Sequence, residues 1–393
     1  MPLQKAEEGN WNYPTTIWFG NGRISELAEA CSTLGMHNPL LVTDPGLATL
    51  PMIAETLTAN QLAGMASGLF SDIKPNPNGT NIKAGVKQYN SGQHDGVIAF
   101  GGGSALDAGK AIALMVGQSH SLWDFEDAGD NWKKVNADRI APLVAVPTTA
   151  GTGSEVGRAA VIINEAHHRK VIIFHPGILP GIVIADPQLT VGLPPDITAA
   201  TGMDALSHNL EAYCSPGYHP MADGIALEGM RLIKQWLTVA HNEPANLTAR
   251  GHMLVASSMG ATAFQKGLGA MHALAHPLGA LYDVHHGLLN AVLMPYIIAH
   301  NRVAIERKMQ HLARILELEQ ASTGVDSVLA FIIKLRQQLG IPHNLKFVGI
   351  DTSRIPAIAE MATHDPSAGG NPLRLSKNDY AELLSNAIKG VLR

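Results

Sequence analysis

Residues 95–113 read DGVIAFGGGSALDAGKAIA, an apolar strand that runs through three glycines into a helix. A strand, a glycine turn and a helix start present backbone N–H groups and a positive dipole end, where a phosphate can bind. Glycine suits this turn because a side chain would hold a pyrophosphate away from the backbone. The spacing is not the GxGxxG fingerprint. Gly102, Gly103 and Ser104 therefore predict either a phosphate site or an ordinary tight turn of an α/β protein.

Similar short apolar runs recur on both sides of this motif up to about residue 190. They are TTIWFG at 15–20, PLLVTDPG at 39–46, APLVAVPTTAG at 141–151 and IVIADP at 182–187. Their alternation with helical stretches predicts a parallel sheet flanked by helices in a domain spanning 1–190. After the Pro- and Gly-containing segment DPQLTVGLPP, apolar residues recur at helical spacing, so we expect a helical domain over 191–393.

Composition fits a large globular protein and argues against several other classes. The chain has 393 residues, more than one core usually holds, and its net charge is -5 without a basic run that would suit a nucleic acid. No apolar stretch has the length of a membrane span, and the first residues lack the apolar core of a signal peptide. Cys31 and Cys214 are the two cysteines, so no disulfide framework is implied. We expect a cytoplasmic protein with a small-molecule partner.

A second polar loop favours a dinucleotide as the ligand of the first domain. The strand APLVAVP ends in TTAGTGSE, which places Thr148, Thr149 and Thr152 at a strand's carboxyl end, where ligands of open α/β sheets bind. Asp44 follows another strand, where a carboxylate can bind an adenosine ribose and repel a 2′-phosphate, which favours NAD over NADP. As alternatives, the loop can cap a helix, and Asp44 can be an ordinary turn residue.

Two pairs of potential metal ligands stand four residues apart in apolar helical stretches. Asp204 and His208 lie in GMDALSHNLEAY, and His272 and His276 lie in MHALAHPLGALY. This spacing places each pair on one face of its helix. Burying unpaired groups of this kind is costly, and a shared cation removes that cost. The alternative for either pair is a hydrogen bond on the helix face without a metal.

The next helical run, GLLNAVLMPYIIAH, follows directly after His285 and His286. Three imidazoles and one carboxylate suit a divalent ion such as Fe²⁺ or Zn²⁺ and leave a position open for a substrate oxygen. Spacing alone does not decide whether His285 or His286 binds the ion. It also leaves open which of His272 and His276 does not bind the ion.

Taken in order, GGGSALDAGKAIA, PTTAGTGSE, GMDALSHNLEAY and HALAHPLGALYDVHHG resemble the iron-containing, group III alcohol dehydrogenase family over nearly the whole chain. The resemblance implies an N-terminal Rossmann-like domain, an all-helical C-terminal domain and chemistry in the cleft between them. It assigns the metal to Asp204, His208, His272 and His286, and leaves His276 as the catalytic residue. The dinucleotide contacts that it implies are Asp44, Asn76, Gly103, Ser104, Thr148, Thr152 and Lys170.

The resemblance further implies an NAD-linked oxidation of a small primary alcohol, or the reverse reduction of an aldehyde. Fe²⁺ is the expected metal, with Zn²⁺ or Mn²⁺ as alternatives, in a homodimer or larger homo-oligomer. The chain departs from the family pattern at Arg158 and Lys266, each of which either receives an anionic substrate tail or is a surface cation. Two rival functions are a lyase or cyclase of the dehydroquinate synthase type, which restores its NAD, and a metallohydrolase, which does not bind NAD.

Overall fold

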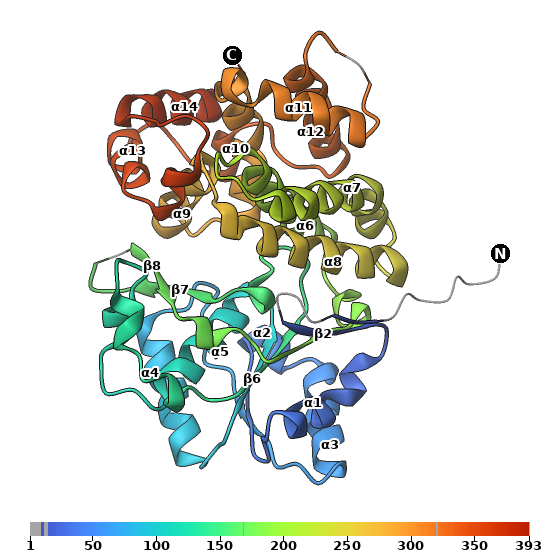
Figure 1. The fold of residues 1–393 in the computed structure, drawn as a ribbon, viewed down its shortest axis with the longest axis vertical. Coiled ribbons are helices and arrows are strands. Elements are labelled where there is room, and N and C mark those ends of the chain that lie inside the picture. Colours follow the sequence, from blue (N-terminus) through green and yellow to red (C-terminus); the bar gives the residue numbers. More distant parts are fainter. Residues whose placement is uncertain (1–8, 12–14, 168, 320, 393) are drawn as a thin grey trace, which may run out of the picture. The chain divides into compact units, whose positions relative to one another are not determined.

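The computed structural model describes residues 9–11, 15–167, 169–319 and 321–392, which form two compact units (Figure 1). The first unit holds the described residues up to Thr149 together with Gly153–Gly192. The second unit holds Ala150–Thr152 and Leu193–Arg393. The short segment Ala150–Thr152 therefore belongs to the second unit, although the chain on both sides of it belongs to the first.

A seven-stranded sheet forms the centre of the first unit, in the order β1-β2-β9-β6-β5-β3-β4. All neighbouring strands are parallel except the antiparallel pair β1 and β2. The strands are β1 (Gly9–Trp11), β2 (Thr16–Phe19), β3 (Leu40–Val42), β4 (Gly68–Phe70), β5 (Val97–Gly101), β6 (Leu143–Pro147) and β9 (Ile182–Ala185). This sheet confirms the predicted α/β class of the N-terminal part.

The five predicted strands are β2, β3, β5, β6 and β9, whereas β1, β4 and a hairpin were not predicted. The hairpin joins β7 (Ala159–Asn164) and β8 (Arg169–Phe174), which form a separate antiparallel sheet. Every position of β5 and β6 is buried, as expected for central strands of a parallel sheet that is covered on both faces. The helices of this unit are α1 (Leu27–Thr33), α2 (Pro45–Ala48), α3 (Pro51–Leu62), α4 (Gly79–Ser91) and α5 (Gly103–Met115).

Helix α5 lies directly against β5, the strand that leads into it. Gly109 permits this close packing, because a Cβ at this position would lie 2.5 Å from the Cβ of Ala99 in β5. The glycine turn between them positions the N-terminus of α5 at the carboxyl end of β5. Apolar side chains from the strands, among them Leu41, Ile98 and Val144, are buried in the core of this unit.

The second unit contains helices and no strand among its described residues, as predicted. Its α-helices are α6 (Pro195–Cys214), α7 (Pro220–Asn242), α8 (Leu247–Ala263), α9 (Ala270–Tyr282), α10 (His286–His300), α11 (Arg302–Ile315), α12 (Gly324–Gln338), α13 (Ile355–Thr363) and α14 (Lys377–Lys389). Helix α6 starts with Pro195, which suits a first turn because its missing N–H would have no partner in the helix. It contacts α7, α8 and α10 and is buried from Thr198 to Cys214.

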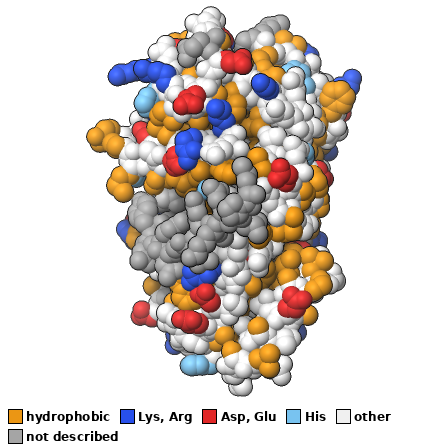
Figure 2. Space-filling model, turned by 90° about the vertical axis from the view of Figure 1, so that its right-hand side faces the viewer, with side chains coloured by type: hydrophobic (Ala, Val, Ile, Leu, Met, Phe, Trp, Pro, Cys, Tyr) orange, Lys and Arg blue, Asp and Glu red, His pale blue; other side chains and the backbone are white. Residues whose placement is uncertain are grey.

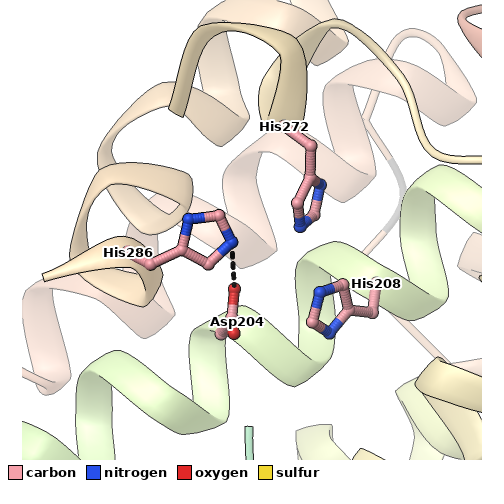
Figure 3. Close-up of side chains that lie close together, drawn as sticks. All are labelled: Asp204, His208, His272 and His286. Atoms are coloured by element: carbon pink, nitrogen blue, oxygen red, sulfur yellow. Dashed lines mark ion pairs between the residues drawn. The ribbon is translucent and has the colours of Figure 1, made fainter. Parts of the chain in front are cut away.

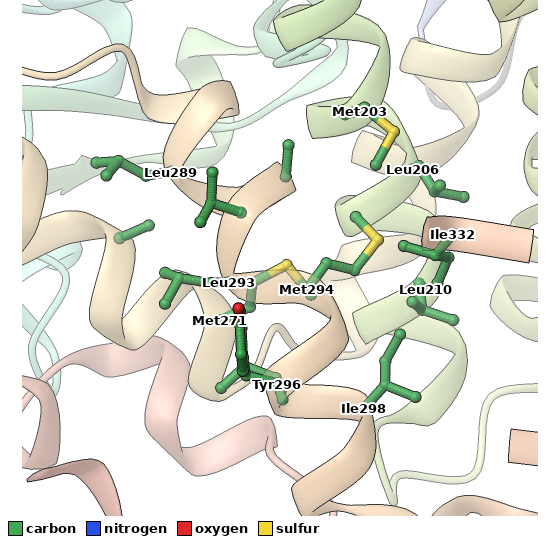
Figure 4. Packing of buried hydrophobic residues seen from close by; sticks show 14 of the residues in the cluster. Met203, Leu206, Leu210, Met271, Leu289, Leu293, Met294, Tyr296, Ile298 and Ile332 are labelled. Carbon is green, nitrogen blue, oxygen red and sulfur yellow. The ribbon is translucent and has the colours of Figure 1, made fainter. Parts of the chain in front are cut away.

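The core of the second unit contains side chains from all of these helices, and Figure 4 shows the part around α6, α9 and α10. The labelled members are Met203, Leu206, Leu210, Met271, Leu289, Leu293, Met294, Tyr296, Ile298 and Ile332. Because α6 and α10 are buried on almost every side, a polar residue within them requires a hydrogen-bond partner or a counter-charge. The few ionisable residues on these helices are therefore the places to look for a site.

On the face shown in Figure 2, cationic and acidic side chains are interspersed and do not gather into a patch of one sign. Among the described residues, no single helix has the length and hydropathy of a membrane span. Helices α10 and α11 pass that test only when taken together, and they are bent by 108° where they meet.

Replacing Gly109 with alanine should destabilise the first unit, because the new Cβ would lie 2.5 Å from the Cβ of Ala99 and 3.1 Å from its Cα. We expect a loss of about 1–3 kcal/mol in the free energy of unfolding. The matched control Gly224→Ala lies in α7, where nothing comes within 4 Å of the Cβ position. It should raise stability by up to about 1 kcal/mol. Denaturant unfolding measures both changes, and a Gly109→Ala variant as stable as the parent contradicts this packing.

Candidate metal centre

Four side chains from three helices of the second unit converge on one point (Figure 3). Asp204 and His208 lie one turn apart on α6, His272 lies near the start of α9, and His286 is the first residue of α10. One ligand atom from each lies within 4.8 Å of the others. Among the described residues, this is the one group of three or more His, Cys, Asp or Glu side chains that could hold a metal ion.

These side chains are largely removed from water. Asp204, His208 and His272 are buried, and the side chain of His286 is 25% exposed. Burial, together with the nearby His208, holds the pKa of His272 well below its usual value, so this ring is neutral and offers a lone pair. The Nε2 of His286 lies 3.8 Å from Asp204 Oδ1, the ion pair drawn in Figure 3. The group therefore combines one carboxylate with imidazoles in a dry setting.

Two of the imidazoles are oriented by hydrogen bonds on their outer ring nitrogens. His272 Nδ1 lies 2.7 Å from Glu211 Oε2, and His208 Nδ1 lies 3.2 Å from the carbonyl oxygen of Gly151. When Nδ1 donates its proton to these oxygens, Nε2 keeps its lone pair and can bind a cation. Both bonds lie within the second unit. They give the rings the tautomer that a metal site requires.

Glu211 was not identified from the sequence, although it lies only three residues after His208 on α6. Its carboxylate accepts the backbone N–H groups of Gly269 at 2.9 Å and Met271 at 2.8 Å, where α9 begins. Burial raises the pKa of Glu211 to about 7, even though these N–H groups favour the ionised form. The carboxylate thus joins the start of α9, and with it His272, to α6.

Two glycines allow the neighbouring segments to approach α6 closely. A Cβ on Gly151 would lie 2.9 Å from the carbonyl oxygen of Thr201 and 3.0 Å from its Cα. A Cβ on Gly287, the residue after His286, would lie 3.0 Å from the carbonyl carbon of Ala200. Larger residues would push the loop and α10 away from the α6 backbone. Gly151 of the Thr-Ala-Gly sequence and Gly287 of the His-His-Gly turn therefore also allow close packing against α6.

The side-chain nitrogen of Asn290, one turn after His286 on α10, lies among the ligand atoms. It is 2.8 Å from Asp204 Oδ1, 3.1 Å from His272 Nε2 and 3.2 Å from His286 Nε2. An amide nitrogen carries two hydrogens, so it cannot satisfy all three of these atoms when each offers a lone pair. Such a surplus of lone pairs aimed at one point suits a divalent cation. The donor set therefore fits a metal ion.

His276, predicted as the catalytic residue, lies beside this group and is not one of the four. Its ring stacks on the ring of His286, with centroids 5.4 Å apart. Its Nδ1 lies 2.8 Å from Oδ2 of Asp365, the residue before the 3-10 helix η10 (Pro366–Gly370). Burial alone would raise the pKa of Asp365, but His276 and hydrogen bonds from Ser367 lower it below its usual value. Nothing local in the sequence indicated Asp365, which is 89 residues away.

Most of the residues predicted to bind a dinucleotide gather in the first unit, at the carboxyl ends of β3, β5 and β6. Gly102 precedes the first residue of α5 and offers no side-chain cap. The N–H of Thr148 donates to the carbonyl of Gly101 at 3.0 Å, and the Thr149 hydroxyl oxygen lies 3.4 Å from the Cβ position of Gly102. Asp44 Oδ2 lies 3.6 Å from the Cβ position of Gly101. Two polar loops and one carboxylate thus surround the glycine turn.

Asp44 also has a local structural role. Its side chain caps α2 by accepting the N–H of Leu47 at 3.0 Å, as the turn interpretation of this residue expects. One carboxylate oxygen is committed to this cap, while the other is the one nearest the glycine turn. Thr152, in contrast, belongs to the second unit.

Asn76, Ser104 and Lys170 lie around one segment of the first unit. The hydroxyl of Ser104 donates to the carbonyl of Pro75, which precedes Asn76. Lys170 of β8 is the register partner of Ile163, whose N–H donates to the carbonyl of the residue after Asn76 at 2.8 Å. The hairpin and the PNPN segment are therefore held together beside the N-terminus of α5.

The structure corrects our expectation for Lys266, which is neither a surface cation nor open to a substrate tail. Its side chain is 1% exposed, and its Nζ lies 2.5 Å from Asp223 Oδ1 and 3.3 Å from the carbonyl oxygen of Tyr213. The lysine thus binds near the C-terminal end of α6, where a cation is favoured by the helix dipole. Arg158 is exposed, with its guanidinium over the ring of Phe174.

Comparison with known proteins gives matches along the whole chain. Residues 14–187 match the family model of the iron-containing alcohol dehydrogenases, and residues 198–388 match the model of the C-terminal region of this family. The 1,3-propanediol dehydrogenase of Klebsiella pneumoniae is 36% identical over 381 residues, which are 95% of this chain and 97% of the relative. The 4-hydroxybutyrate dehydrogenase of Cupriavidus necator is 36% identical over 383 residues, which are 96% of this chain and 99% of the relative.

A solved structure also resembles this chain over nearly its whole length. The sulfoacetaldehyde reductase of Bifidobacterium kashiwanohense in complex with NAD⁺ has a TM-score of 0.86 at 29% identity, covering 98% of this chain and 99% of that one. These relatives are dehydrogenases and a reductase, so the lyase and hydrolase alternatives are not favoured. The resemblance seen in four sequence motifs is confirmed. This chain belongs to the iron-containing alcohol dehydrogenase family and is an oxidoreductase that acts on CH–OH groups.

Proposed function

We propose that the divalent ion of this alcohol dehydrogenase is held by Asp204, His208, His272 and His286. The convergence of their ligand atoms within 4.8 Å is the observation that carries the proposal. The hydrogen bonds on the outer nitrogens of His208 and His272 support it, because they direct both Nε2 lone pairs to the same point. Fe²⁺ is the ion expected of the family, although this donor set also accepts Zn²⁺ or Mn²⁺. A bound ion would supply Lewis-acid stabilisation of the substrate oxygen.

We assign NAD(H) binding mainly to the first unit, and metal binding and catalysis to the second. The open N-terminus of α5 after Gly102 suits a pyrophosphate, and the Asp44 carboxylate suits an adenosine ribose. The NAD⁺ bound to the sulfoacetaldehyde reductase supports this assignment. The full proposed set is Asp44, Asn76, Gly102, Gly103, Ser104, Thr148, Thr149, Thr152 and Lys170.

We assign proton transfer to His276. Its Nδ1 faces the carboxylate of Asp365, which accepts a hydrogen bond, so the proton of the neutral ring resides on Nδ1. The other ring nitrogen, Nε2, is then free of a proton and can accept one from an alcohol during oxidation. The stacked ring of His286 places this base next to the proposed metal ligands. Asp365 acts as a positioning residue that fixes the orientation and tautomer of the ring.

For the substrate, we propose a small primary alcohol or the corresponding aldehyde. The relatives named above act on 1,3-propanediol and 4-hydroxybutyrate. Lys266 is already paired with Asp223, so it is not available to bind the carboxylate of a substrate such as 4-hydroxybutyrate. We further propose a cytoplasmic homodimer or larger homo-oligomer. The buried free thiols of Cys31 and Cys214 suit a reducing compartment.

The adjacent pair His285 and His286 offers a matched test of the metal site. His286→Ala removes one of the four converging groups, so the variant should lose bound metal and at least about a hundredfold in kcat/KM. His285→Ala removes an exposed ring outside the group and should retain both. Metal analysis of the purified proteins and NADH formation from 1,3-propanediol measure the two effects. Equal metal content in both variants would rule out His286 as a ligand.

His276→Asn should lower kcat by about 10²–10⁴-fold, the usual contribution of a general acid or base, without loss of metal. Asp365→Asn should cause a smaller loss of kcat, because asparagine retains the cap of η10 but removes the charge that fixes the imidazole tautomer. Initial rates in H₂O and D₂O, with metal content measured in parallel, check this. A His276→Asn variant with the parent's kcat and solvent isotope effect would remove His276 from the proton path.

Asp44→Ser should shift the cofactor preference from NAD towards NADP. Serine keeps the helix cap at the start of α2, so the change isolates the carboxylate charge. Loss of one repulsive charge next to a 2′-phosphate should change the ratio of kcat/KM values for the two cofactors by about tenfold or more. Steady-state kinetics with both dinucleotides gives the ratio. An unchanged ratio would leave Asp44 with its capping role alone.

A further inference from the structure

We propose that Asn290 is a positioning residue of the metal centre, whose amide N–H holds the Asp204 carboxylate in its ligating orientation. The inference rests on the metal site proposed above. It concerns a residue that contributes neither a charge nor a titratable proton. Asn290 is fully buried on α10, one turn after His286, and its nitrogen lies 2.8 Å from Asp204 Oδ1.

The direction of the amide follows from its surroundings. Reversing it would place Oδ1 about where the nitrogen now lies, facing the carboxylate of Asp204 and the lone pair on His272 Nε2. Two acceptors at such a distance repel each other, whereas an N–H donor is attracted to both. The nitrogen must therefore face the ligands.

The opposite end of the same side chain shows what this arrangement costs. Oδ1 of Asn290 is buried and has no hydrogen-bond partner among the described residues. Leaving a buried carbonyl unpaired is unfavourable, because the group loses its hydrogen bonds to water and gains none in the protein. An apolar residue of similar size would avoid this cost within the otherwise apolar helix α10. The presence of asparagine is therefore explained by its N–H groups, which point into the metal site.

Asp204 is the acceptor that remains available to Asn290 when the ligand set is in use. The lone pairs of His272 Nε2 and His286 Nε2 each serve a single partner, and a cation would occupy them. A carboxylate has several lone pairs, so Asp204 can bind a cation and still accept the amide N–H. Ligating carboxylates are commonly held in this way, and loss of such a partner lowers metal affinity by about 10–100-fold.

The test uses Co²⁺ alone as the probe, titrated into metal-free full-length protein and followed by calorimetry and by visible absorption. Asn290→Leu removes the N–H groups at similar volume. Asn290→Ala removes the whole amide without adding a charge. The control Asn60→Leu removes another buried asparagine, which lies in the first unit and donates to Ser67 Oγ at 3.1 Å.

We expect both Asn290 variants to bind Co²⁺ about 10–100-fold more weakly than the parent and to show altered visible bands, whereas Asn60→Leu binds as the parent does. Parent affinity in Asn290→Leu would overturn the proposal. Parent affinity in Asn290→Ala would also overturn it. If circular dichroism shows that Asn290→Leu does not fold, Asn290→Ala decides alone. A parent protein that binds no Co²⁺ would instead contradict the metal site itself.

Discussion

Burying the Asp204 carboxylate in an apolar helical core is unfavourable unless positive charge and hydrogen bonds compensate it. Three imidazoles with one ligand atom each near the carboxylate cannot provide that charge while they remain neutral. A divalent cation provides it and uses the lone pairs of the imidazoles at the same time. This requirement explains why helix α6 and the later helices α9 and α10 present their few polar residues to a single point.

The surrounding structure holds that point in place. Glu211 joins the start of α9 to α6 through two backbone N–H groups and His272. Gly151 contributes a carbonyl to His208, and the lack of a side chain lets it lie against the α6 backbone. Since Gly151 belongs to the loop that follows β6, one loop carries both a contact to a proposed metal ligand and threonines that we assign to the dinucleotide. The proposed metal site and the proposed cofactor site thus share a segment of chain.

Local patterns in the sequence predicted the features that depend on neighbouring residues. Short apolar runs indicated five strands, and i, i+4 spacing indicated Asp204 with His208 and His272 with His276. Of these four residues, His276 lies beside the converging group and the other three belong to it. Long-range contacts could not be predicted in this way, so Asp365 became apparent only from its bond to His276. The sequence could not show that Lys266 is buried against Asp223, because this contact depends on how α7 packs. Glu211 and Asn290 could have been considered from the sequence, since each follows a proposed ligand by three or four residues on the same helix. Neither residue type, however, is a typical signal for a metal site.

Anomalous diffraction tests the central claim most directly. Crystals grown with Zn²⁺ or Fe²⁺ would be measured on both sides of the metal absorption edge. We expect one strong peak in each chain, about 2.0–2.2 Å from one ligand atom each of Asp204, His208, His272 and His286. A peak at other residues, or no peak in a fully loaded protein, would contradict it.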